Sequence, residues 1–270
     1  MEQIWESNNK ELSLNVAINC KGKCVFQVVA SDDKPFSQYV NRKITVNNFR
    51  EITLSFPVTP KKLKIQVECI RGSQNTNDFI VNIVEKPLKK YNIKIDTDTQ
   101  NFLDLAVYFS QVAGFQKSNE NGKLYRTENK MYNIKYYPKI VDFATGNVLN
   151  TPARIGHKTG IIEVAQVSML KYTIPMRMII LLHEFSHKYK NPLMNLPISD
   201  EIGADLNALY LYLGCGFSKV DAIFVFANVF LRAQTQSNLE RMNKIMEYIK
   251  KFENEEYANV ILWVGKNMIY

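Results

Sequence analysis

The chain has 270 residues, of which 46% are hydrophobic, and a formal net charge of +8. This length fits one large domain or two of medium size, and the apolar fraction is sufficient for buried cores. The longest apolar candidate, residues 223–231, falls short of the roughly 18 residues that a membrane span needs, so we expect no membrane-spanning segment. The first six residues carry neither a basic start nor an apolar stretch, which predicts a cytoplasmic protein without a secretory signal.

The positive charge and the cysteines indicate little about function. The basic stretches 61–64 and 86–94 fall in predicted strands or a linker, which favours solvated surface over nucleic-acid binding. Cys20 and Cys24 flank Lys21-Gly22-Lys23 and would meet across a hairpin there. A metal site would need a second pair of cysteine ligands, and Cys69 stands alone. We expect reduced, mostly buried thiols at all four cysteines, which are Cys20, Cys24, Cys69 and Cys215.

Residues 1–90 have the pattern of β structure. Apolar and polar residues alternate over 12–18 and 63–69, which is the period of a half-buried strand. Further short β-branched or aromatic runs, separated by turn-rich pieces, occur at 24–30, 43–46, 51–56 and 79–84. About six strands without a helical pattern predict a small antiparallel β-sandwich, of the kind that serves as an adaptor or docking domain.

The pattern becomes mainly helical after the charged linker 86–98. A helix capped by Asp98 or Thr99 is expected to end near Gly114, and two short strands follow at 132–137 and 160–165. Later helices are expected from Pro175 to Asn191, over 199–213, after Ser218, and from about Gln236 to the end. The predicted fold class is therefore α+β, with the β-sandwich followed by a mainly helical domain and a small sheet over residues 91–270.

The segment His183-Glu184-Phe185-Ser186-His187 lies on the helix predicted to start at Pro175. Residues four apart lie above one another on one helix face, so His183 and His187 can bind one metal ion. Glu184 is turned about a third of the way around the helix, where it can reach a metal-bound water without being a ligand. Two neutral imidazoles and a carboxylate beside a metal-bound water are what zinc-dependent hydrolysis requires.

Zinc needs a third protein ligand, and the residues themselves leave several candidates. No histidine follows His187. Glu201 and Asp205 are four apart on the next predicted helix, so one can bind the metal while the other accepts a hydrogen bond from a ligand imidazole. Asp200 and His157 are alternatives, although His157 could instead approach a substrate or be a surface residue.

With these residues the chain resembles the zincin superfamily and, within it, the gluzincins. In that branch His-Glu-x-x-His is followed on the next helix by a glutamate ligand and, four residues later, by an aspartate. The resemblance covers residues 98–215 and implies that His183, His187 and Glu201 bind zinc. It further implies that Glu184 is the general base and that Asp205 holds a ligand imidazole.

The resemblance also implies a place for the substrate. Zincins bind an extended peptide along the edge strand of their sheet, and the segment Gly160–Ala165 resembles this strand. The substrate-binding residues implied in this way are Ile161, Ile162, Glu163 and Val164.

Two features depart from the family pattern. Zincin peptidases use a further side chain to stabilise the oxyanion, and the sequence does not choose among the candidates Tyr172, Tyr210, Tyr212, Arg232 and Arg241. Lys188 directly follows the second histidine, at a position that is usually uncharged.

Two functions are consistent with the sequence. The first is a zinc-dependent metallopeptidase that acts on a peptide or protein substrate. The second is a structural or assembly protein, because the size, the leading β-domain and the Lys- and Asn-rich composition resemble phage-encoded zincin-like proteins, including virion ring components. That resemblance implies a homo-oligomer or a virion assembly as the partner and the virion as the location. A structural zinc site normally has four protein ligands, whereas only three good ones are found here, which favours the peptidase.

Overall fold

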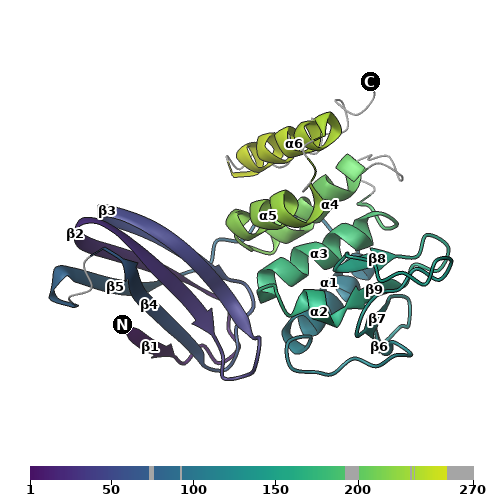
Figure 1. The fold of residues 1–270 in the computed structure, drawn as a ribbon, viewed down its shortest axis with the longest axis horizontal. Coiled ribbons are helices and arrows are strands. Elements are labelled where there is room, and N and C mark those ends of the chain that lie inside the picture. The colour runs from purple at the N-terminus through teal and green to yellow at the C-terminus, as the bar shows by residue number, and fades with distance from the viewer. Residues whose placement is uncertain (73–75, 92, 192–200, 232, 234, 254–270) are drawn as a thin grey trace. The chain divides into compact units, whose positions relative to one another are not determined.

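The computed structural model describes residues 1–72, 76–91, 93–191, 201–231, 233 and 235–253 (Figure 1). The chain divides into two compact units. The first comprises Met1–Tyr91 with the short segments Thr173–Pro175 and Cys215–Ser218, and the second comprises the rest of the chain. None of the described helices combines the length and the apolar composition that crossing a membrane requires.

The first unit is built around one five-stranded antiparallel sheet. Its central strand β2 pairs with β3 on one side, while β4 and β5 pair with different parts of β2 on the other side, and β1 pairs with β4. The predicted antiparallel strands are thus confirmed, and all of them belong to one hydrogen-bonded sheet, whereas a sandwich has two. The strands are β1 (Glu2–Trp5), β2 (Leu12–Ser31), β3 (Gln38–Phe56), β4 (Leu63–Arg71) and β5 (Phe79–Lys86), and a short 3-10 helix, η1 (Thr76–Asp78), precedes β5.

The strands predicted at 12–18 and 24–30 are one continuous strand, because the chain forms a bulge between them rather than a turn. Pairing with β3 jumps from Asn19↔Phe49 to Lys23↔Asn47, so three residues of β2 lie opposite Asn48 alone. Gly22 and Asn48 both have positive φ, and the Gly22 N–H donates to Asn48 Oδ1 at 3.1 Å. An inserted bulge bends a strand without ending its pairing, so the hairpin expected at Lys21-Gly22-Lys23 is wrong.

The core of this unit follows the alternation seen in the sequence. Leu63, Ile65 and Val67 of β4 are buried while the residues between them are partly exposed. The cysteines Cys20, Cys24 and Cys69 belong to the same buried cluster, as expected for thiols that act as small apolar side chains.

The second unit has a four-stranded sheet in the order β6-β7-β9-β8. β7 and β9 are parallel, and the other two pairs are antiparallel. The sequence predicted β7 and β9 but not β6 and β8, which are too short to show a clear period. The strands are β6 (Lys123–Arg126), β7 (Asn133–Tyr137), β8 (Ala153–Ile155) and β9 (Ile162–Ala165).

The helices of the second unit are largely those that the sequence predicts. The first is capped by Asp96, whose side chain accepts the Thr99 N–H at 2.7 Å, rather than by Asp98 or Thr99. The start expected at residue 199 and the end of the last helix lie outside the described residues. The elements are α1 (Thr97–Val112), α2 (Gln166–Met169), α3 (Ile174–Ser186), α4 (Glu201–Gly214), α5 (Lys219–Val225), the π-helix η3 (Phe226–Phe230) and α6 (Gln236–Glu253).

Candidate metal centre

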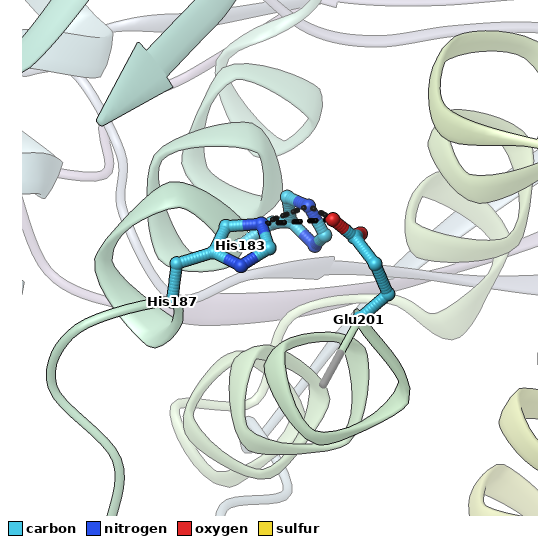
Figure 2. Close-up of side chains that lie close together, drawn as sticks. All are labelled: His183, His187 and Glu201. Atoms are coloured by element: carbon cyan, nitrogen blue, oxygen red, sulfur yellow. Dashed lines mark hydrogen bonds and ion pairs between the residues drawn. The ribbon is translucent and has the colours of Figure 1, made fainter. Parts of the chain in front are cut away.

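Helices α3 and α4 bring two histidines and one glutamate together. The Nε2 atoms of His183 and His187 are 3.1 Å apart, and each lies 3.7 Å from one oxygen of the Glu201 carboxylate. Figure 2 shows the two imidazole rings and the carboxylate pointing toward one another. A tetrahedral zinc ion with bonds of about 2.0–2.1 Å places its ligand atoms roughly 3.3 Å apart, so this group could hold a metal ion.

Of the candidates for the third ligand, Glu201 is the one whose carboxylate lies close to both Nε2 atoms. Asp205 lies instead behind His183, with its Oδ1 at 2.9 Å from the Nδ1 of that ring. His157 is exposed in the turn between β8 and β9, and Asp200 lies outside the described residues. Among the residues that the structure describes, the group of His183, His187 and Glu201 is the one with metal-ligand spacing.

Arg241 of α6 binds the carboxylates around this cluster. Its Nε and Nη2 atoms donate to the two oxygens of Asp205 at 2.8 and 3.0 Å, and Nη2 also lies 3.0 Å from Glu201 Oε2. The sequence placed Arg241 among the oxyanion candidates, and no local pattern links it to Asp205, which is 36 residues away. The bidentate pair neutralises the buried Asp205 and orients it toward His183.

Glu184 directly follows His183 in α3 and is buried next to Ile155 of β8. Only 8% of the residue is exposed, and the backbone N–H of Ile155 in β8 lies close to its carboxylate. Burial raises the pKa of Glu184, and the nearby Glu201 adds to this, while His183 and the Ile155 amide oppose it. A carboxylate with a raised pKa is suited to taking up a proton near neutral pH.

The two imidazoles have opposite pKa shifts in the absence of a metal. Burial lowers the pKa of His187 to about 4, helped by the neighbouring His183, so its ring is neutral at pH 7 and can act as a ligand. Burial also works to lower the pKa of His183, but the contact with Asp205 outweighs it and the pKa is raised. A metal ion at His183 Nε2 would therefore compete with the proton that the raised pKa favours.

The π-helical turn η3 supplies an aromatic contact to the first histidine. The Phe230 ring stacks on the His183 ring with centroids 4.0 Å apart and planes 30° apart. The Leu231 N–H donates to the Phe226 carbonyl five residues earlier at 2.9 Å, which is the wider hydrogen bond of a π-turn. This wider turn extends the helix predicted after Ser218 and holds Phe230 against the imidazole.

The strand implied as the substrate-binding edge is not an edge. β9 pairs with β7 on one side and with β8 on the other, and β8 is the edge strand on that side of the sheet. Ile162 and Val164 point into the core, and Glu163 pairs with Arg154 at 2.6 Å. Ile161 directly precedes β9. The expectation that 160–165 forms an edge was wrong because the three residues of β8 give no recognisable strand pattern, while substrate binding by residues 161–164 stays a prediction.

The remaining candidates for an oxyanion group have different environments. Tyr210 is buried, and its hydroxyl accepts the Lys94 N–H at 2.9 Å. Tyr212 is fully buried in α4, and Tyr172 is half-buried after α2. Arg232 lies outside the described residues. The unusual Lys188 places its ammonium 5.6 Å from the centroid of the Tyr189 ring.

Comparison with known proteins adds no relative. The chain matches no family model, no curated protein and no solved structure among those compared. The geometry of the His183, His187 and Glu201 cluster, with the groups around it, is therefore what indicates the chemistry of this protein.

Proposed function

We infer that this protein is a zinc-dependent metallopeptidase with a zincin-like fold over residues 91–270. The observation that carries this proposal is the convergence of His183, His187 and Glu201, with the buried carboxylate of Glu184 beside them. Three ligands leave the fourth position of a tetrahedral ion open, which is typical of catalytic rather than structural zinc sites.

Each side chain has a distinct role in this proposal. Zinc, held by the three ligands, would supply a bound water whose pKa is lowered toward neutrality. Glu184 would accept a proton at its carboxylate, and the nearby Ile155 N–H would help to orient that carboxylate. Asp205 lies 2.9 Å from the Nδ1 of His183, on the side of the ring away from the other two ligands, and Nε2 is the atom that would face the ion.

The substrate in this proposal is an extended peptide that pairs with β8. This strand is the sheet edge next to Glu184, because Ile155 lies at its end. An extended peptide adds to such an edge through main-chain hydrogen bonds. The N-terminal unit would then serve as a docking module for the protein that is cleaved.

Replacing Glu184 tests the proposal directly. Glu184→Gln is expected to abolish cleavage of a peptide library while the protein still binds one equivalent of zinc, because the amide cannot take up the proton. Zinc content and cleavage are measured on wild type, on Glu184→Gln and on the control His157→Gln, which changes the exposed histidine outside the cluster. If wild type loaded with stoichiometric zinc is as inert as Glu184→Gln, the peptidase proposal fails.

One observation favours a second candidate, a structural or assembly protein such as a ring or neck component of a phage virion. Arg241 lies 3.0 Å from Glu201 and forms a bidentate pair with Asp205, so both carboxylates have a cationic partner without any metal. A cluster stabilised in this way can persist as part of a scaffold. A ring-shaped oligomer on a sizing column, together with an inert zinc-loaded protein, would support this candidate over the peptidase.

A further inference from the structure

A buried asparagine of α4 makes three hydrogen bonds to the end of α3. Asn207 is fully buried, and its Nδ2 donates to Ser186 Oγ at 2.7 Å and to the Tyr189 carbonyl at 3.3 Å. Its Oδ1 accepts the Asn191 N–H at 2.9 Å. Both donor hydrogens and one acceptor position of the amide are therefore used, all by the segment that carries the second histidine.

The same segment is connected further into the second unit. The side chain of Asn191 donates to the Lys94 carbonyl at 3.1 Å, and the Lys94 N–H donates to the hydroxyl of Tyr210, one helical turn after Asn207. The end of α3 is thus bound to α4 and to the segment before α1 through buried and partly buried polar groups. Such a network is rigid when all its members are satisfied.

The location of this network matters because the metal ligands come from both helices. Ser186 directly precedes His187, and Asn207 follows Glu201 by less than two helical turns. A further close polar contact between the two helices, from His183 to Asp205, lies on the ligand itself. The bonds of Asn207 therefore fix the spacing of α3 and α4 beside the ligands without contacting the ion.

We propose that Asn207 is a positioning residue, which sets the distance between the imidazoles and Glu201 before a metal binds. This inference rests on the proposed metal centre and goes beyond it, because it assigns the preorganisation of the site to one buried amide. Ser186 is its partner in this role, and the backbone groups of Tyr189 and Asn191 complete the set.

The test compares two variants that break these bonds with one that only weakens the core. Asn207→Leu removes all three hydrogen bonds at similar volume, and Ser186→Ala removes one of them with little risk to folding. Leu213→Ala shortens a buried side chain in the last turn of the same helix and serves as the control. Zinc affinity is measured by competition with a chromophoric chelator, and ligand geometry by the visible absorption of bound Co²⁺.

The expected result is a loss of about tenfold in zinc affinity for Asn207→Leu, with a smaller loss for Ser186→Ala, as for other groups that orient metal ligands. The Co²⁺ spectrum should change in Asn207→Leu and stay like that of wild type in Leu213→Ala. Equal loss of zinc affinity in Leu213→Ala, or a change within about twofold in Asn207→Leu, would overturn the inference.

A measurement without metal separates this inference from the proposed function. In the metal-free protein, Asn207→Leu should speed hydrogen exchange at the Asn191 amide, while Leu213→Ala should not do so selectively. If wild type binds neither zinc nor cobalt, the metal centre fails, and the exchange rates still decide whether Asn207 holds the end of α3. If exchange at the Asn191 amide is unchanged in Asn207→Leu, then Asn207 does not hold the end of α3, whether or not the wild type binds metal.

Discussion

At the scale of single residues, the candidate site depends on a buried carboxylate that lies between a histidine and an arginine. The Asp205 side chain is 1% exposed and meets His183 on one side and the Arg241 guanidinium on the other. A charge removed from water is tolerated when it is paired and hydrogen-bonded, and removing one partner leaves the other uncompensated. Arg154 and Glu163 form a comparable pair, but their side chains are 31% and 20% exposed, so water screens it.

The first prediction concerns these two arginines. Arg241→Met should lower the free energy of unfolding of the metal-free protein by about 3 kcal/mol, because it leaves Asp205 with a buried, half-paired charge. The matched change Arg154→Met should cost about 1 kcal/mol or less. Urea unfolding followed by circular dichroism measures both, and equal losses would show that Asp205 does not depend on Arg241.

At the scale of secondary-structure elements, one buried arginine binds α3 to two other helices. Arg177 is fully buried in α3, and its guanidinium donates to the carbonyls of Ser110 and Met169, each at 3.0 Å. These carbonyls lie in the last turns of α1 and α2, where helices lack internal partners for their carbonyls, and the Met169 carbonyl also accepts the Tyr172 N–H at 3.1 Å. A cation at a helix C-terminus also interacts favourably with the helix dipole.

The second prediction follows from this arrangement. Arg177→Met should destabilise the protein by about 2–3 kcal/mol, because two buried carbonyls lose a charged donor. Ser110→Ala is the control, since it keeps the carbonyl and removes a hydroxyl that has no hydrogen-bond partner among the described residues. Thermal unfolding of the two variants should separate them clearly, and similar melting temperatures would contradict the role of Arg177.

The helices and strands also show which structural features the sequence patterns predict correctly and which they miss. The alternation in 63–69 correctly predicted β4, and the buried run before His183 correctly predicted the helix that carries the motif. The bulge at Gly22 escaped prediction, because lysine and glycine beside a strand fit a turn equally well. β8 escaped because three residues carry no period, and with it the identity of the sheet edge was missed.

At the scale of the whole molecule, the second unit is held together by an aromatic core that joins helices to strands. Phe102 of α1 stacks on Phe185 of α3 at 4.0 Å and contacts Tyr132 beside β7. Phe109 of α1 packs edge-on against Tyr125 of β6 and Tyr136 of β7. Such ring contacts stabilise the core beyond the burial of apolar surface. Ionisation of its buried tyrosines should therefore unfold the core cooperatively.

The third prediction is unfolding of this unit in alkali. Burial raises the pKa of Tyr125 and Tyr132 from 10.0 to about 12, with nearby acidic or phenolic groups adding to the shift. Groups whose pKa is raised by folding stabilise the folded state fully below the unfolded pKa. That stability is lost as the pH rises through the folded value, so helix content should fall together with a rise in tyrosinate absorbance near pH 12.

Tyr132→Phe provides the control for the alkaline transition, because it keeps the ring contacts and removes one ionising group. Its unfolding midpoint should lie at higher pH than that of wild type. Full ionisation of the tyrosines near pH 10 with the helices intact would contradict the prediction that the aromatic core unfolds with them.

The sequence by itself determined the parts of this protein that depend on local geometry. The helical period places His183 and His187 on one face with Glu184 turned aside, and the alternation of apolar residues predicts the strands of the N-terminal sheet. Only the tertiary structure decided that Glu201 faces the imidazoles, that Arg241 binds Asp205, and that β8 is the edge beside Glu184. These depend on packing between segments far apart in the chain, and a residue's neighbours along the sequence do not specify such contacts.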